Sequence, residues 1–307
     1  MASPGTSRVC GRLRFTVGSA VWVAYRLAMP ELPEVEAFGR WLLPQVRGQC
    51  IDTVEVLKPR LVRPVSVPVF IESVQGSRVQ DLRRRGKCLL WDCVRPSGEA
   101  ELLVTHLGMT GSWRMLPGHG PLPRHTAVVL GIGEQRVVLE DPRQFGHLRL
   151  GNAAVPVLGP EPLDPCFTPE LLGEALARGR RPIKVCLMDP SRLAGVGNLY
   201  ASEALFLAGI DPTTPVHQLG FEVIGRLHAV LRTLLESAVE RNLQALRSDR
   251  SMLYQQQGVP EDPSEGGLWV YDREGQPCFR CASPIVRFMQ SGRSTFWCPQ
   301  CQRPWSG

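Results

Sequence analysis

The sequence has 307 residues, of which 43% are hydrophobic and 21% charged, and its formal net charge is +6. This composition is that of an ordinary soluble protein with room for two domains and a small third. It contains no apolar run of about 18 residues, so no membrane span is expected. The net charge is a weak sign of an anionic partner, because four of the six charges come from arginines in residues 1–28, and residues 29–307 carry only +2. Any nucleic-acid-binding surface is therefore expected as a local cluster of basic residues and not in the total charge.

Residues 1–28 lack the pattern of a folded segment. They contain no acidic residue and end in an apolar patch without the cleavage pattern of a secretory signal. Their basic residues are Arg8, Arg12, Arg14 and Arg26. A transit peptide stays open as an alternative. We expect an extension, either a mis-assigned start or a removable leader, because Met29 opens the patterned part of the chain.

The next stretch reads Met29-Pro30-Glu31-Leu32-Pro33-Glu34-Val35-Glu36 and has two interpretations. As structure, the prolines lead into a helix whose first turn places carboxylates at the positive end of the helix dipole. As chemistry, loss of Met29 would leave Pro30 as a free amine with a pKa of about 7.7–8.0. Such an amine can hold an electrophilic carbon as an iminium while Glu31 moves protons. The stretch alone favours the first interpretation, and the rest of the chain reverses that preference.

An amphipathic helix is predicted over residues 37–44, followed by seven short apolar runs broken by Gly and Pro. The runs cover residues 51–57, 77–82, 87–93, 101–105, 126–132, 137–140 and 147–150. Their number and spacing predict a β-sandwich or barrel of roughly 120 residues.

From residue 159 the pattern becomes helical. Thr168 followed by Pro169 is typical of a helix start. Helices are predicted over residues 170–177, 183–188, 198–208 and about 220–243. Residues 251–274 are polar and rich in turn-forming residues, as expected of a linker.

The ten cysteines fall into two groups. Six are scattered, which suits reduced thiols in a cytosolic protein: Cys10, Cys50, Cys88, Cys93, Cys166 and Cys186. The other four form two CxxC pairs, Cys278, Cys281, Cys298 and Cys301. This spacing predicts one structural Zn²⁺ held by four thiolates, with no position left open for water.

The segment around these cysteines is basic and aromatic. Residues 275–307 contain Arg280, Arg287, Arg293 and Arg303 and no acidic residue. A generic zinc ribbon would also fit this segment, but a hairpin that binds phosphates is favoured.

Taken together, these motifs resemble formamidopyrimidine-DNA glycosylases, base-excision repair enzymes of the Fpg/Nei family. The resemblance covers residues 29–307. Its signatures are residues 29–36, His106-Leu107-Gly108-Met109-Thr110-Gly111-Ser112, Asp141-Pro142-Arg143-Gln144-Phe145-Gly146, Gly195-Val196-Gly197-Asn198-Leu199-Tyr200-Ala201-Ser202-Glu203 and the terminal zinc hairpin.

The resemblance implies a multidomain α and β fold. It comprises an N-terminal β-sandwich with a leading helix, a helix-two-turn-helix domain and a C-terminal zinc-finger β-hairpin. The expected boundaries are an extension at 1–28, the N-terminal catalytic domain at 29–158, the helix-two-turn-helix DNA-binding domain at 159–250, a linker at 251–277 and the zinc finger at 278–307.

The resemblance also implies roles for individual residues. Pro30 would be the nucleophile, Glu31 the acid/base, and Lys87 a contact to the phosphates beside the lesion. Met109, Arg143 and Phe145 would fill the space left by a flipped-out nucleotide. The remaining phosphate ligands would be Lys184, Asn198 and Arg293. Glu34 would be a second active-site carboxylate, although a role in matching the helix dipole is equally open.

The implied activity is that of a bifunctional DNA glycosylase and AP lyase acting on oxidised bases in duplex DNA. A Schiff base on Pro30 would be followed by β,δ-elimination. Oxidised purines such as 8-oxoguanine and formamidopyrimidines are the favoured lesions. We expect one structural zinc ion, damaged double-stranded DNA as partner, no membrane association, a monomer, and a bacterial cytoplasmic location at the nucleoid when bound to DNA.

Two departures from the family pattern bear on these expectations. Gln144 stands where many members have a second basic residue, and residues 242–248 lack the Gly/Thr-rich stretch that closes over oxidised guanine in bacterial relatives. Two alternatives remain: a non-catalytic damaged-DNA-binding protein if residues 1–28 are retained, and an endonuclease VIII-like enzyme for oxidised pyrimidines. Leu32-Pro33 disfavours the latter, whose members usually read Gly-Pro there.

Overall fold

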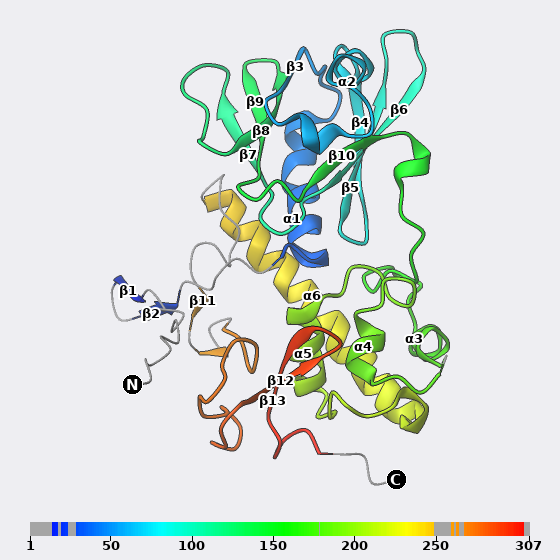
Figure 1. The fold of residues 1–307 in the computed structure, drawn as a ribbon, viewed down its shortest axis with the longest axis vertical. Helices are drawn as coiled ribbons and strands as arrows, with labels where there is room; N and C mark the ends of the chain where they lie inside the picture. Colours follow the sequence, from blue (N-terminus) through cyan, green and yellow to red (C-terminus); the bar gives the residue numbers. More distant parts are fainter. Residues whose placement is uncertain are drawn as a thin grey trace, which may run out of the picture.

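The computed structural model describes residues 14–17, 20–23, 29–177, 179–248, 259–260, 262–263 and 267–303. Figure 1 shows two sheets and helix α1 at one end of the molecule, a group of helices at the other, and the hairpin of β12 and β13 beside α5. The long helix α6 runs from the helical group toward the sheets.

The N-terminal domain contains two antiparallel four-stranded sheets, with strand orders β10-β6-β5-β4 and β3-β8-β9-β7. Their bounds are β3 Thr53–Val56, β4 Arg78–Arg85, β5 Cys88–Val94, β6 Ala100–His106, β7 Ser112–Pro117, β8 Thr126–Ile132, β9 Gln135–Glu140 and β10 His147–Leu150. Their paired arrangement confirms the predicted β-sandwich. All seven predicted runs overlap strands, whereas β7 was not predicted.

Helix α1 spans Leu32–Val46, so it begins before the amphipathic stretch predicted at residues 37–44, and Glu34 lies in its first turn, as predicted from the prolines. The reason is that Pro33 lies in the first turn, where a proline removes no intrahelical hydrogen bond. The Glu34 carboxylate then accepts a hydrogen bond of 2.8 Å from the backbone N–H of Glu31, the residue that precedes the helix. The short helices α2 Val67–Val74, η1 Pro59–Val62 and η2 Asn152–Ala154 were not predicted.

A large core joins α1 to both sheets. Phe38 of α1, Trp91 of β5 and Trp113 of β7 are fully buried in it. The rings of Trp91 and Trp113 pack at a centroid distance of 5.3 Å. Leu243 and Leu246 of α6 belong to the same core, so the end of α6 is anchored in the N-terminal domain.

A second core holds the helix domain together. Its elements are α3 Pro169–Leu176, α4 Ile183–Leu187, α5 Asn198–Leu207, η3 Val216–Gln218 and α6 Phe221–Ser248. The bounds of α3, α4, α5 and α6 match the predicted helices closely, except that α6 continues beyond residue 243, and η3 was not predicted. The C-terminal hairpin consists of β12 Val286–Gln290 and β13 Arg293–Trp297. It packs on Phe206 of α5 in a third, smaller core.

Three short strands form a separate sheet: β1 Arg14–Val17, β2 Ala20–Val23 and β11 Val259–Pro260. The first two lie within the expected extension at 1–28, most of which falls outside the described residues, and these strands were not predicted. Much of the expected linker at 251–277 also lies outside them. In the part of the chain that is described, no helix is long and apolar enough to cross a membrane.

Candidate active site

The carboxylate of Glu31 is held by the N-terminus of α5. It accepts hydrogen bonds from the backbone N–H groups of Gly197 at 2.5 Å and Leu199 at 3.0 Å. A Cβ atom on Gly197 would lie 2.3 Å from the Glu31 Cδ, so the contact requires glycine at that position. Pro30 and Glu31 are both buried, and Glu31 is 4% exposed. The helix domain thus fixes the residue that follows Pro30.

The environment of Glu31 opposes its ionisation. Burial raises the pKa of Glu31, while the positive charge of Lys87 and the backbone N–H groups of α5 act in the opposite direction. Lys87 is half-buried between β4 and β5. A raised pKa keeps more of a carboxyl group in the protonated form, from which it can donate a proton as a general acid.

Glu34 lies in the same cluster. Its Oε2 accepts from the backbone N–H of Glu31 at 2.8 Å. Its Oε1 accepts from the hydroxyl of Tyr200 at 2.6 Å and from the side-chain amide of Asn242 at 3.3 Å. Burial raises the pKa of Glu34, and the hydrogen bond from Tyr200 opposes the rise. Sequence reasoning assigned no role to Tyr200 or Asn242, although Tyr200 lies within the 195–203 signature.

A cavity of about 480 Å³ adjoins this cluster. Leu199 and Tyr200 of α5, Arg241 and Asn242 of α6, and Trp269 are among its lining residues. Residues that hold Glu31 and Glu34 therefore also form the wall of this cavity.

Arg143 and Phe145 lie on the loop between β9 and β10, next to the loop that carries Met109. Asp141 joins the two loops, since it accepts from the Thr110 hydroxyl at 2.7 Å and from the Gly146 N–H at 2.7 Å. Phe145 is 45% exposed, and the Arg143 guanidinium lies 4.7 Å from the centre of its ring. Met109 is half-buried. An exposed aromatic ring and a guanidinium are thus presented together on the surface.

Lys184 connects α4, α5 and the C-terminal hairpin. Its Nζ donates to the Asn198 Oδ1 at 2.6 Å, to the Thr295 hydroxyl at 2.8 Å and to the Ser294 carbonyl at 3.2 Å. Asn198 in turn donates to the Ser294 carbonyl at 2.9 Å. Burial, followed by the charge of Arg293, lowers the pKa of Lys184 to about 8.

Arg293 is exposed at the start of β13. Together with Arg181 and Lys184 it lines a cavity of about 360 Å³ between α4 and the hairpin turn. The structure therefore brings Lys184, Asn198 and Arg293 together, and their role as phosphate ligands stays a prediction. These residues contact no part of the Asp141 loops in the described hydrogen-bond network.

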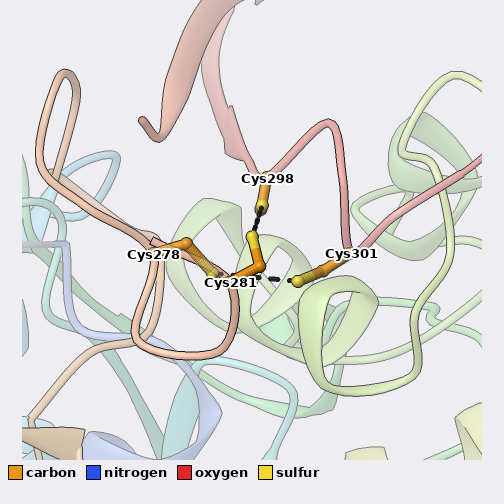
Figure 2. A group of neighbouring side chains, drawn as sticks. All are labelled: Cys278, Cys281, Cys298 and Cys301. Atoms are coloured by element: carbon orange, nitrogen blue, oxygen red, sulfur yellow. Dashed lines mark hydrogen bonds between the residues drawn. The ribbon is translucent and has the colours of Figure 1, made fainter. Parts of the chain in front are cut away.

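The four cysteines converge at the base of the hairpin (Figure 2). All four sulfur atoms lie within 4.8 Å of one another. The Sγ atoms of Cys278 and Cys301 are 3.8 Å apart, and those of Cys281 and Cys298 are 3.4 Å apart. A tetrahedral zinc ion with bonds of about 2.3 Å separates its sulfur ligands by about 3.8 Å, so the donor set fits one structural Zn²⁺.

Three family models match the chain in order. The Formamidopyrimidine-DNA glycosylase N-terminal domain matches residues 29–148, the Formamidopyrimidine-DNA glycosylase H2TH domain matches residues 158–249, and the zinc finger found in FPG and IleRS matches residues 275–304. The chain belongs to the formamidopyrimidine-DNA glycosylase family.

Curated members of the glycosylase family align over nearly their whole length. The formamidopyrimidine-DNA glycosylase of Carboxydothermus hydrogenoformans is 38% identical and that of Aromatoleum aromaticum 40%, each over 90% of this chain and 100% of the relative. Among solved structures, a mutant of the Lactococcus lactis enzyme in complex with Fapy-dG-containing DNA superposes with a TM-score of 0.78 at 30% identity. That match covers 89% of this chain and 100% of the other. The L. lactis enzyme with abasic-site DNA gives 0.77.

Membership of this family confirms the predicted three-part fold and the structural zinc site. It also makes this chain a DNA-repair glycosylase that binds DNA. The roles of Pro30, Glu31, Lys87 and the other site residues stay predictions.

Proposed function

We propose that this glycosylase is bifunctional, excising an oxidised base and then cleaving the DNA strand through a Schiff base on Pro30. The observation that carries the proposal is the placement of the Glu31 carboxylate, which directly follows Pro30 and accepts two backbone N–H groups from α5. A buried acid with a raised pKa beside a potential amine is the pair of groups that this chemistry requires.

The proposed reaction begins when the unprotonated Pro30 amine attacks C1′ of a flipped nucleotide and the damaged base leaves. Opening of the sugar gives an iminium between the Pro30 nitrogen and C1′. Abstraction of a C2′ proton then expels the 3′-phosphate in β-elimination, and a second elimination expels the 5′-phosphate. In this scheme Glu31 donates and accepts the protons.

The proposed DNA contacts form two groups. Lys87, Lys184, Asn198 and Arg293 bind phosphates of the damaged strand, which makes affinity fall with rising salt. Arg143 pairs with the base left opposite the vacated site, and Met109 and Phe145 replace its lost stacking. The exposure of Phe145 and its contact with the Arg143 guanidinium support this part of the proposal.

A free Pro30 amine is essential to the mechanism, because an amide nitrogen has no available lone pair. The test compares a chain beginning at Pro30 with the chain that retains residues 1–28. Borohydride should link the first covalently to abasic-site DNA and leave the second unlinked. Tight binding of lesion DNA by both forms without any trapping would support the non-catalytic DNA-binding alternative instead.

Oxidised purines are the proposed lesions. The solved L. lactis structures that this chain resembles contain Fapy-dG in one case and an abasic site in another. Single-turnover excision from duplexes containing 8-oxoguanine and from duplexes containing an oxidised pyrimidine should proceed faster for 8-oxoguanine.

The domain boundaries at 29–158, 159–250, 251–277 and 278–307, a monomeric state and a cytoplasmic location are further parts of this proposal. Limited proteolysis tests the boundaries, and light scattering of the purified protein tests the monomer. Fractionation of the native host tests the location.

A further inference from the structure

The C-terminal part of α6 leaves the helix domain and packs against the N-terminal domain. Figure 1 shows α6 running up to α1, and the two helices are in direct contact. Leu243 and Leu246 lie in the core of the N-terminal domain, where they are 5% and 0% exposed. This face of α6 therefore reaches the helix that follows Pro30 and Glu31.

Asn242 is the polar residue on this otherwise apolar face. It is 2% exposed and lies among Val239, Leu243 and Leu246, which are also buried. Burying an amide costs free energy unless its groups are hydrogen-bonded. Its Nδ2 donates to the Ala238 carbonyl within α6 at 2.9 Å and to the Glu34 Oε1 at 3.3 Å.

Glu34 transmits this contact to the predicted catalytic centre. The same carboxylate accepts the Tyr200 hydroxyl at 2.6 Å and the backbone N–H of Glu31 at 2.8 Å. Glu31 is then held on its other side by Gly197 and Leu199. The position of Glu31 thus depends on α5 directly and on α6 through Glu34.

We infer that Asn242 is a positioning residue for base excision. Its amide, carried by α6 from the helix domain, holds Glu34 in the conformation that fixes the backbone of Glu31. This inference rests on the proposed function of Pro30 and Glu31. A buried asparagine that only set the register of α6 on α1 would affect stability and leave the rate per active molecule unchanged.

The experiment uses the chain that begins at Pro30 and three variants of α6. Asn242→Leu removes the donor, Asn242→Asp replaces the amide by a carboxylate of the same shape, and Gln244→Leu is the matched control. Gln244 is an exposed amide two residues away that donates to Glu240 at 3.1 Å. Single-turnover excision of 8-oxoguanine is measured at saturating enzyme and normalised to the fraction that borohydride traps on abasic-site DNA. Affinity is measured on a duplex with an uncleavable tetrahydrofuran abasic analogue.

Asn242→Leu should lower the normalised excision rate about tenfold, the effect of one hydrogen bond to a charged group. Asn242→Asp should lower it at least as much, because its carboxylate repels that of Glu34. Gln244→Leu should keep the parent rate, and all three should bind the tetrahydrofuran duplex like the parent.

Parent-like normalised rates for Asn242→Leu or Asn242→Asp would overturn the inference. So would failure of both variants to fold, because Asn242 would then serve only the register of α6. A parent chain that neither excises nor traps would instead refute the proposed function itself.

Discussion

Replacing Lys184 by methionine should remove a pH dependence from DNA binding. The Lys184 side chain is 1% exposed, and burial followed by the charge of Arg293 lowers its pKa from 10.5 to about 8. Because the folded pKa is lowered, the cost of holding the charge is fully present below pH 8 and disappears as the pH rises toward 10.5. In the proposed complex, a DNA phosphate pairs with this cation and offsets that cost.

The size of the effect follows from proton linkage. Free Lys184 is mostly protonated at pH 7 and mostly neutral at pH 9, whereas the phosphate of the proposed contact would keep it protonated. A pKa of about 8 in the free protein then predicts that affinity falls about tenfold between these two pH values. The Lys184→Met variant lacks this titration, so its affinity should fall about tenfold less over the same range.

Fluorescence anisotropy on the tetrahydrofuran duplex at pH 7, 8 and 9, with ionic strength held constant, measures the difference. The Arg293→Ala variant provides a second comparison. Removing the neighbouring charge should raise the pKa of Lys184, so the fall in DNA affinity should begin at a higher pH. If the parent and Lys184→Met weaken by the same factor from pH 7 to 9, the buried cation does not meet a phosphate and the reasoning is refuted.

Three further predictions concern the other parts of the site. Glu31→Gln should bind 8-oxoguanine duplex like the parent and lose base excision in single-turnover assays, because the amide cannot transfer the proton; unimpaired excision would remove Glu31 from the mechanism. Arg293→Ala should retain zinc and reduce the slope of log K against log salt by roughly one phosphate contact, and an unchanged slope would contradict its assignment. Cys298→Ser should release the metal, as measured by elemental analysis, and weaken DNA binding while borohydride trapping persists; zinc retained at one equivalent would contradict the four-thiolate site.

The features that the sequence predicted well are local ones. The CxxC spacing predicted that four thiolates lie together, and the structure confirms this cluster. The prediction succeeds because the two cysteines of each CxxC pair are held close by a short turn. The strands were predicted to within a few residues from apolar runs bounded by Gly and Pro. Strand β7 was missed because Arg114 interrupts its apolar pattern; that arginine forms an ion pair with Glu140 of the neighbouring strand.

Helix α2 was missed because its local sequence favours a strand. Its sequence, Val67-Pro68-Val69-Phe70-Ile71-Glu72-Ser73-Val74, is rich in β-branched residues that favour strands, so packing of Phe70 and Val74 into the core overrides local propensity. Sequence also could not reveal the partners of Glu34, because Tyr200 is 166 residues away and Asn242 is 208 residues away. Contacts over such separations depend on how the domains pack.

The arrangement around α5 explains how three parts of the fold contribute to one site. Its first turn supplies the N–H groups that hold Glu31, and Asn198 at its start binds the hairpin carbonyl of Ser294. Further along, the buried Glu203 carboxylate accepts the backbone N–H groups of residues 269–271 at 2.8–2.9 Å, which fixes the chain that leads into the zinc module. The hairpin therefore attaches to one side of α5 and the predicted catalytic acid to its N-terminus. In the described network the four cysteines make no hydrogen bond to Glu31 or Glu34. Loss of zinc should therefore weaken DNA binding directly, and should change the rate of the Pro30 chemistry only if it displaces α5.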